Sequence, residues 1–397
     1  MKSMNAPARA AGEALGSDRL VCTRCIYDER VPAITFDDQG VCNYCHQIDQ
    51  LIEQYGTAQP KGEELLQKTI ETIKIEGKGK RYDCIIGVSG GVDSSYMVYL
   101  AKEVWGLRPL AVHYDNTWNS AIATQNIGKI LKGLDVDLCT WVVNNKEADD
   151  IYRAFFEAGV PELDVSTDLA FAEVLQRIAY KFGVRTILEG HSFVEEGITP
   201  LGKNYFDGRY IKEIHRRFGK MKLETYPLMT FSRMLFWSAA ARIRKFRPFW
   251  YMDYSKASAR KLLEERYGWT YYGGHHLENR MAAFCHSVYF PQKFDADLRN
   301  NTLAAWVRQG KMSRQDAWNE YNTPPLIEDE LVNYLQKRLG LSNNEYCHIM
   351  AAPPHSWREF PTYKKWFERL RPLFKILADR ELVTRSFYLK YCFPTPE

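Results

Sequence analysis

Short apolar runs alternate with longer stretches of helical apolar spacing through the middle of the chain. The first run, residues 83–88, is long enough for one buried strand, and it ends at Ser89-Gly90-Gly91 before a stretch with helical spacing. Similar runs and helical stretches follow in alternation. The further expected strands are 109–113, 138–143 and 185–189, and the expected helices are 121–133, 147–157 and 168–182.

This alternation predicts an α/β fold with a parallel sheet, helices on both faces and right-handed crossovers. Ligands of such sheets gather beyond the carboxyl ends of the strands, so the residues just past those ends are candidates for binding a cofactor. They are Ser89, Gly90, Gly91, Asp93, Ser94, Ser95, His113, Asp115, Asn116 and Gly190. Asp115 and Asn116 would meet a ribose or a base edge, or they form a plain turn.

The segment after the fourth expected strand adds two candidate catalytic residues, His191 and Glu196. They could bind a metal or a substrate, although a loop histidine is most often simply solvated. For His191 and Glu196, both a role in binding and simple solvation therefore stay open.

The segment from Ser89 to Ser95 has the properties of an anion-binding loop. Its two glycines let backbone N–H groups approach a ligand closely, and its serines add hydroxyl donors. The helix that follows directs its unpaired N–H groups and its positive dipole end at the same point. No lysine follows the glycines, so the loop is not of the type that clamps a γ-phosphate with a lysine.

Four cysteines have the spacing of a metal site. Cys22 and Cys25 form one pair, Cys42 and Cys45 form the second, and sixteen residues separate the pairs. This spacing is typical of a structural zinc site with four thiolate ligands, and an iron–sulfur cluster is the alternative. The chain has nine cysteines and no recognisable export signal, which argues against disulfides.

Length and charge narrow the class of protein. A chain of 397 residues suggests two or three domains, and 53 basic against 49 acidic side chains leave a charge of +4, too near balance to indicate a nucleic-acid partner. The most apolar region, 231–252, is interrupted by basic residues too often for a membrane span. We expect a cytoplasmic protein.

The same patterns suggest where the domains begin and end. Residues 1–20 are alanine-rich and are expected to form a disordered leader. The expected units after it are a zinc module at 21–50, a helix and linker at 51–80, a nucleotide domain at 81–250 and a mostly helical substrate or partner region at 251–397. In the last unit, residues 313–316 form a capping box, and basic and aromatic residues at 364–371 form either a docking surface or a solvated helix face.

The loop from Ser89 to Ser95 resembles the SGGxDS loop of the PP-loop ATP pyrophosphatases. The resemblance implies a fold like that of the adenine nucleotide alpha hydrolases, in which ATP is split into AMP and pyrophosphate. It also implies that a substrate oxygen is adenylylated. The cofactors expected on this basis are ATP and Mg²⁺, beside structural Zn²⁺ at the cysteines.

A narrower resemblance covers residues 21–321. The paired cysteines, the serine–glycine loop, the segment from Glu189 to Ile198 and the blocks 268–278 and 291–299 are similar, in order and spacing, to the N-acetyl sugar amidotransferases of bacterial surface-polysaccharide synthesis. This implies that ATP activates the acetamido oxygen of a nucleotide-linked N-acetyl sugar. Ammonia then attacks the carbon and AMP departs, leaving an acetamidino group on a precursor of LPS O-antigen or a related glycan.

The same resemblance implies roles for individual residues. Asp93 would hold Mg²⁺ or orient the loop, and Lys293 and Arg299 would clamp phosphate oxygens unless they belong to a solvated basic loop. A substrate loop would contain His275, His276 and Glu278. Ammonia in this family comes from a separate glutamine amidotransferase (glutaminase) subunit with a cyclase-like partner, and we recognise no glutaminase domain in this sequence.

Two departures from the family pattern leave the sugar open. His275 stands where a lysine is expected, and the segment before Arg299 lacks a second basic residue. A PP-loop tRNA thiolase is the alternative function, although such enzymes usually need a catalytic cysteine pair beside the nucleotide site and a markedly basic surface. A non-enzymatic ATP-binding scaffold is the third reading, which the intact serine–glycine loop disfavours.

Overall fold

The computed structural model describes residues 19–198, 205–273, 278–325, 327–380, 382–383 and 385–394. The expected leader up to residue 18 lies outside the described residues. So do His275 and His276, two of the three candidate substrate residues.

Five parallel strands form one sheet in the order β3-β2-β1-β4-β5. The predicted parallel sheet is confirmed, and four of its strands lie where the sequence places them. β5 was not anticipated, because it is only three residues long, lies at the sheet edge and carries two basic side chains. The strands are β1 Cys84–Gly87, β2 Pro109–Asp115, β3 Leu138–Val142, β4 Thr186–Leu188 and β5 Arg244–Phe246.

Helices cover both faces of the sheet, as predicted. Successive side chains of a strand point to opposite faces, so β1 sends Ile86 to one face and Ile85 to the other. The Ile86 face packs against α2 Pro60–Gly77, α3 Val92–Tyr99, α4 Ala121–Leu134 and α10 Lys256–Tyr267. The Ile85 face packs against α5 Asn145–Ala158, α6 Val165–Lys181 and helices from later in the chain.

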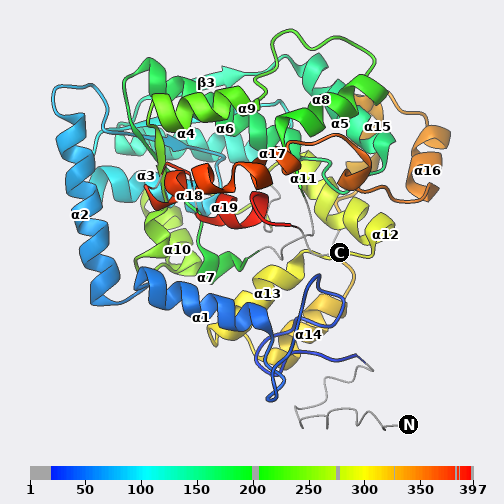
Figure 1. Ribbon diagram of the computed structural model, residues 1–397, viewed down its shortest axis with the longest axis horizontal. Helices are drawn as coiled ribbons and strands as arrows, with labels where there is room; N and C mark the ends of the chain where they lie inside the picture. Colours follow the sequence, from blue (N-terminus) through cyan, green and yellow to red (C-terminus); the bar gives the residue numbers. More distant parts are fainter. Residues whose placement is uncertain are drawn as a thin grey trace.

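The remaining helices belong mainly to the N-terminal module and to the C-terminal half, which is mostly helical as predicted (Figure 1). Three π-helical turns, Leu100–Val104, Phe236–Ala240 and Cys285–Tyr289, continue α3, α9 and α11, and Pro248–Trp250 and Trp357–Glu359 are 3-10 turns. The helices are α1 Asn43–Tyr55, α7 Phe193–Glu196, α8 Gly208–Phe218, α9 Phe231–Leu235, α11 Arg280–Phe284, α12 Phe290–Phe294, α13 Arg299–Arg308, α14 Arg314–Asn322, α15 Leu331–Leu339, α16 Asn343–Ala351, α17 Lys364–Arg369, α18 Arg371–Asp379 and α19 Arg385–Tyr391.

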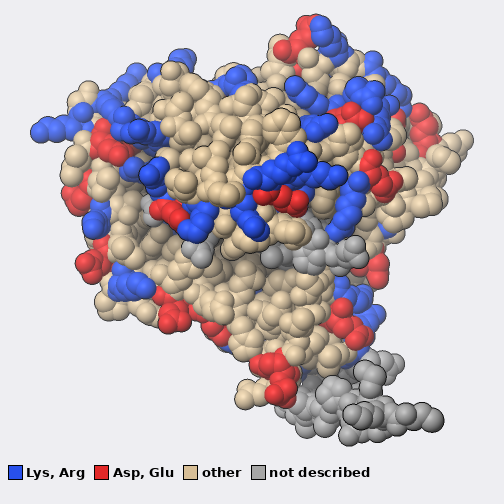
Figure 2. Space-filling view, in the orientation of Figure 1, with Lys and Arg blue, Asp and Glu red and all other residues tan. Residues whose placement is uncertain are grey.

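The C-terminal helices α17, α18 and α19 return across the front of the molecule (Figure 1). Their buried rings, including Phe367, Phe374 and Tyr391, belong to the same apolar cluster as the Ile85 face of the sheet. Figure 2 shows basic side chains on the outer surface of this segment, where Lys365, Arg369 and Arg371 are exposed.

The N-terminal module packs against the C-terminal half rather than against the sheet. Its cysteines and Tyr27 share one apolar cluster with Leu303 and Ala304 of α13 and Trp318 of α14. Figure 1 shows the module beside these two helices, at the opposite end of the molecule from β3. Among the described residues, no helix combines the length and the apolar character needed to cross a membrane.

Candidate functional site

The carboxyl ends of β1 and β4 mark the point where the strand order reverses. From β1 the chain continues outward through β2 to β3, and then returns across the sheet to β4 on the other side. Crevices at such reversals are the usual ligand sites of open α/β sheets. We call the region beyond the carboxyl ends of β1 and β4 the crevice. Here the loop after β4 touches the first turn of α3, because a Cβ on Gly190 would stand 2.9 Å from the Asp93 carbonyl oxygen.

The loop after β1 needs glycine at position 90 for two reasons. Gly90 has a φ of +84°, and a Cβ there would stand 2.2 Å from the backbone oxygen of Ala123. Gly91 is the N-cap of α3 and has no side chain with which to bond the first N–H groups of the helix. The helix therefore presents donors and a positive dipole end to the crevice, as an anion site requires.

Hydrogen bonds fix the shape of this loop from both sides. Inside the loop, the Ser89 backbone N–H donates to Ser94 Oγ over 3.3 Å, and the Gly91 N–H donates to Ser89 Oγ over 3.3 Å. From outside, the indole N–H of Trp269 donates to the Gly90 carbonyl oxygen over 3.1 Å. The loop is thus held in place by protein contacts before any ligand arrives.

Asp93, in the first turn of α3, is the centre of a charged cluster. Its Oδ1 accepts a hydrogen bond of 2.5 Å from the Tyr254 hydroxyl, and its Oδ2 lies 2.7 Å from the Lys256 ammonium. The same ammonium lies 3.4 Å from Glu196. Although burial lowers the pKa of Lys256, the attraction of Asp93 and Glu196 outweighs it and raises that pKa, so Lys256 is a cation at neutral pH.

His191 faces the same cluster as a neutral ring. Trp250 Nε1 donates to His191 Nδ1 over 3.2 Å, and an indole N–H can only donate. The imidazole proton therefore sits on Nε2, which lies 3.7 Å from Glu196 Oε2. Partial loss of water around the ring, which stays 42% exposed, and the nearby Arg247 guanidinium lower the pKa of His191 to about 4.

Glu189 connects β4 with β5 below this cluster. Its two oxygens lie 2.6 Å from the Lys245 ammonium and 2.8 Å from Arg247 Nε. Burial alone would raise the pKa of Glu189, but the two cations together hold it well below its usual range. β5 supplies Lys245, and Arg247 follows the strand directly, so this short edge segment carries both charges that keep the carboxylate ionised.

Glu278 is the third candidate substrate residue, and it lies over the loop from Ser89 to Ser95. A Cβ on Gly91 would stand 3.8 Å from Glu278 Oε1 and 3.2 Å from the Tyr272 hydroxyl. The Glu278 carbonyl accepts from the Ser120 N–H over 2.8 Å, and Asn279 pairs with Asn119 as an isolated bridge. This segment of the C-terminal half therefore closes one side of the crevice.

Three candidates at the end of β2 bond mainly to the protein itself. His113 is buried, with Nδ1 bonding the Val88 carbonyl over 2.9 Å. Asn116 is buried too and donates to the Tyr152 hydroxyl over 3.0 Å. Asp115 accepts from the Thr117 N–H over 2.7 Å, which makes the turn that was one of its two readings. Their roles in cofactor binding stay predictions.

Lys293 and Arg299 do not meet the nucleotide loop in this structure. The Lys293 ammonium donates to the carbonyls of Ile349 and Ala352 over 2.6 and 2.7 Å, and burial lowers its pKa. Arg299 pairs with Asp297 and donates to the carbonyls of Tyr321 and Thr323 at the end of α14. Both cations tie helices of the C-terminal half together.

The four N-terminal cysteines form the group in the described part of the chain that could hold a metal ion. Their Sγ atoms all lie within 4.8 Å of one another, and the Cys22–Cys45 and Cys25–Cys42 sulfur distances are 3.9 and 3.8 Å. Four sulfurs at tetrahedral corners about 2.3 Å from one zinc ion stand about 3.8 Å apart. The donor set and its spacing therefore fit a single tetrahedral ion.

Arg308 connects the cysteines to the crevice. This buried guanidinium donates to Cys45 Sγ over 3.9 Å and lies on α13, whose other contacts include α7. A few residues on, Lys311 forms an ion pair with Glu195 of α7, beside Glu196. The metal module therefore helps to position the helix that carries one carboxylate of the cluster.

The sequence did not single out several residues of this site. Tyr254 and Lys256 stand in an ordinary polar stretch before a helix, where no spacing pattern sets them apart. Trp269 and Tyr272 lie in the block 268–278, which was noted for its resemblance and not for these rings. Arg247 is one of the basic residues that interrupt the apolar region 231–252, and nothing in the sequence marks it as a partner of Glu189.

Residues 278–371 match the model of the family described as "LPS biosynthesis protein WbpG-like, C-terminal domain". The matched segment begins at Glu278, whose side chain lies beside Gly91 of the loop after β1. The C-terminal half of the chain therefore carries a WbpG-like LPS biosynthesis domain, and the resemblance to surface-polysaccharide enzymes is confirmed there.

Other comparisons find more distant similarity. An uncharacterized protein of Methanocaldococcus jannaschii, MJ1599, is 26% identical over 173 residues, which is 43% of this chain and 58% of that protein. NMN synthetase of Francisella tularensis has a TM-score of 0.31 at 12% identity and covers 72% of this chain and 95% of its own. The U34-tRNA thiolase NcsA of Methanococcus maripaludis, with its 4Fe–4S cluster, has a TM-score of 0.30 at 12% identity, covering 72% and 88%. The NH3-dependent NAD synthetase of Campylobacter jejuni has a TM-score of 0.29 at 13% identity, covering 67% and 99%.

We expect His191 to remain neutral, with its proton on Nε2, until the pH falls to about 4. A histidine in the unfolded chain titrates near about 6.5, so between these values the unfolded state binds more protons. The contribution of neutral His191 to stability should be complete above that window and should fall as the pH drops through it. Nitrogen NMR of the imidazole measures both the pKa and the tautomer.

Trp250→Phe is the matched variant, because it removes the indole donor and keeps an aromatic ring. In this variant the Nδ1-protonated tautomer should become populated. Titration of His191 in the wild-type protein near the value of an unfolded chain would contradict the prediction.

Proposed function

We propose that this chain, which carries a WbpG-like LPS biosynthesis domain, is an ATP-dependent amidotransferase of the cytoplasm. Its substrate would be a nucleotide-linked N-acetyl sugar, and its product the corresponding acetamidino sugar of an LPS O-antigen or a related surface glycan. ATP would be converted to AMP and pyrophosphate.

One observation carries the proposal: the first residues of the LPS biosynthesis domain lie next to the loop from Ser89 to Ser95. Glu278 opens the matched segment and stands over Gly91, while Asn279 bonds Asn116 at the end of β2. A domain associated with surface polysaccharides and a loop suited to phosphate thus form one crevice. A sugar held beside this crevice would lie near a phosphate bound by the loop.

The reaction needs two displacements. The acetamido oxygen attacks the α-phosphorus of ATP and pyrophosphate leaves, so the oxygen becomes part of a good leaving group. Ammonia then adds to the acetamido carbon, loses a proton, and AMP leaves with the former oxygen. The carbon–oxygen bond is replaced by a carbon–nitrogen bond, with no change in oxidation state.

Charge neutralisation along the triphosphate is the main demand on the protein. N–H groups at the start of α3 would hold phosphate oxygens, and the Lys256 cation, which contacts Asp93 of that first turn, would move from its carboxylates to the departing pyrophosphate. Asp93, released from Lys256, would hold Mg²⁺, which usually takes one or two carboxylates together with phosphate oxygens. Mg²⁺ would neutralise the negative charge of the phosphates.

Glu196 is the group best placed to take the proton that ammonia loses. His191 cannot accept on Nδ1, which already accepts from Trp250, and its Nε2 carries the proton. The neutral ring would orient Glu196 from 3.7 Å away. We therefore assign the base to Glu196 and a positioning role to His191.

We propose that the cysteine cluster holds one structural Zn²⁺. Four thiolates leave no open position for a substrate, and all four side chains are fully buried. An iron–sulfur cluster would place several iron ions between the thiolates and so hold them further apart than a single ion does. Arg308 beside Cys45 offsets part of the negative charge of the site.

Ammonia would come from partner subunits. We propose a glutamine amidotransferase subunit and a cyclase-like subunit, as the family resemblance implies. Cys84, on β1, is buried, and burial raises its pKa, so it is not poised as a nucleophile for releasing ammonia from glutamine. The same argument weighs against the tRNA thiolase reading, which needs reactive cysteines at the crevice.

The test is incubation of the purified protein with ATP, Mg²⁺, ammonium and UDP-N-acetyl sugars, followed by mass spectrometry. We expect AMP, pyrophosphate and a sugar product lighter by the difference between oxygen and an NH group. Formation of ADP alone would exclude the proposed reaction. Sulfur transfer to tRNA in a parallel assay would favour the alternative.

Lys256→Met should lower the rate of AMP formation by about 100-fold or more, because it removes a cation from the departing pyrophosphate. Lys256→Arg keeps the charge and should retain more activity. Lys261→Met is the control, since Lys261 lies on the same helix and is exposed. Full activity of Lys256→Met would remove this lysine from the mechanism.

Asp93→Asn should abolish the Mg²⁺-dependent reaction while metal bound at the cysteines stays unchanged.

Cys42→Ser should lower the zinc content from about one ion per chain to a small fraction of that, because three ligands bind the ion much more weakly. Metal analysis measures the content, and thermal unfolding should show a lower midpoint since part of the folding free energy comes from the ion. Cys347→Ser, at an exposed cysteine, is the control. Iron with acid-labile sulfide in the wild-type protein would instead identify a cluster.

A further inference from the structure

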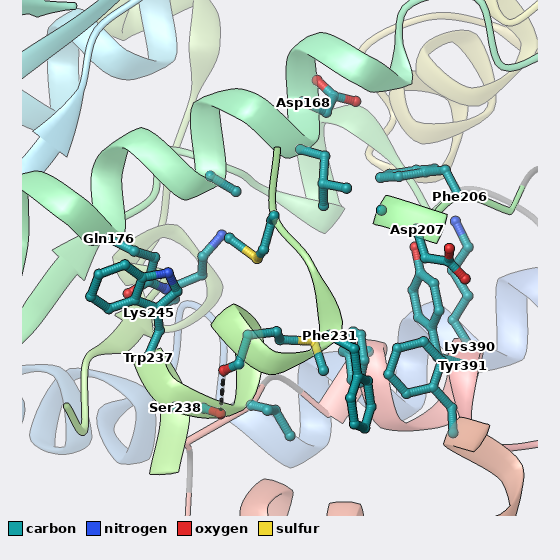
Figure 3. Close-up of a pocket in the computed structure, with 18 of the residues that line it drawn as sticks. Asp168, Gln176, Phe206, Asp207, Phe231, Trp237, Ser238, Lys245, Lys390 and Tyr391 are labelled. Atoms are coloured by element: carbon teal, nitrogen blue, oxygen red, sulfur yellow. Dashed lines mark hydrogen bonds between the residues drawn. The ribbon is translucent and has the colours of Figure 1, made fainter. Parts of the chain in front are cut away.

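A cavity of about 630 Å³ lies between the sheet and the C-terminal helices. Its walls come from α6, from the ends of β4 and β5, from α9 and from α17 and α19. Figure 3 shows Gln176, Lys245 and Trp237 on one side of it and Asp207, Lys390 and Tyr391 on the other. None of the sequence-derived sites accounts for this cavity as a whole.

The cavity shares one wall with the nucleotide crevice. Glu189 and His191 line it, and Gly190 between them touches the backbone of Asp93. The loop after β4 therefore has the phosphate-binding loop on one side and the cavity on the other. A ligand in the cavity can present a group at His191 to a nucleotide held by the loop.

The lining suits a ring with apolar faces and polar edges. Phe231, Trp237 and Tyr391 supply aromatic surface, and the amide of Gln176 and the ammonium of Lys245 supply polar groups beside it. A pyranose has this character, since its C–H faces pack on aromatic rings and its hydroxyls lie around the edge.

Gln176 gives the cavity a specific demand for a hydrogen-bond donor. Its side chain is 8% exposed, and its Oε1 is buried without a hydrogen-bond partner. A buried acceptor left unpaired is unfavourable, and such groups commonly mark a ligand or an ion site. A hydroxyl or an amide N–H of a bound sugar would satisfy it.

The charges that line the cavity balance. Glu189 already pairs with Lys245 and Arg247. A diphosphate therefore gains little electrostatic stabilisation inside the cavity. An uncharged sugar ring fits, and the charged nucleotide diphosphate attached to it would lie toward the opening. The cations are Lys245, Arg247 and Lys390, and the carboxylates are Asp168, Glu189 and Asp207.

We propose that this cavity is the acceptor site and holds the ring of an N-acylated sugar, with Gln176 accepting a hydrogen bond from it. The acyl amide would face His191, on the wall shared with the nucleotide crevice. This inference rests on the proposed function, because it assigns the place of the same acceptor. It also gives the C-terminal helix α19 a role as a wall of the site.

The test measures binding without ATP, by calorimetry and by saturation-transfer NMR, with UDP-N-acetylglucosamine and free N-acetylglucosamine as probes. Gln176→Leu keeps the shape and removes the acceptor, so affinity for both probes should fall by about tenfold or more. Its thermal midpoint should stay equal or rise, because an unpaired buried polar atom is gone. Ala172→Phe fills the cavity and should abolish sugar binding while ATP still binds.

Thr186→Val is the control, since Thr186 Oγ1 is also buried without a partner but does not line the cavity. It should leave sugar binding unchanged. Unchanged affinity in Gln176→Leu and Ala172→Phe would overturn the proposal, as would failure of the wild-type protein to bind either probe. Binding of the UDP probe alone, equally displaced by UDP, would also overturn it.

The two proposals can fail separately. If the wild-type protein turns over the sugar but both cavity variants bind it normally, the acceptor site lies elsewhere and the proposed reaction stands. If the variants lose binding but no AMP is formed from ATP under any condition, the cavity binds the sugar and the proposed reaction is wrong.

Discussion

The close approach of two backbone segments at the reversal of strand order is the constraint on which the site depends. Gly90 must pass the carbonyl of Ala123, and Gly190 must pass that of Asp93, at distances that no side chain allows. The first contact seats the loop after β1 against α4, and the second brings the loop after β4 onto the first turn of α3. The charged groups that follow them in the chain, Asp93 and His191, are neighbours as a consequence.

The cluster around Asp93 joins three parts of the chain that are far apart in sequence. Asp93 comes from the first turn of α3, Glu196 from α7, and Lys256 from the start of α10. A half-buried cation between two carboxylates is best stabilised when all three stay in place, because removing one leaves a charge less well compensated. The cluster therefore couples the packing of these helices to the chemistry of the crevice.

Short sequence patterns predicted those features whose geometry depends on neighbouring residues. The serine–glycine loop and the cysteine pairs are short motifs whose geometry is set by neighbouring residues, and alternating apolar runs were enough to indicate the sheet. Lys256 could not be found in this way, because its role depends on partners about 60 and 160 residues away. Lys293 and Arg299 look like phosphate ligands in sequence, yet in the fold they bond main-chain carbonyls, whose positions no motif records.

The placement of α19 ties a late segment of the chain to the cavity beside the sheet. Tyr391 and Lys390 line that cavity, whereas the loop from Ser89 to Ser95 lies about 300 residues earlier in the chain. A ribosome must therefore translate α19 before the cavity can close. Nascent chains released before that point would carry the serine–glycine loop and yet lack one wall of the cavity.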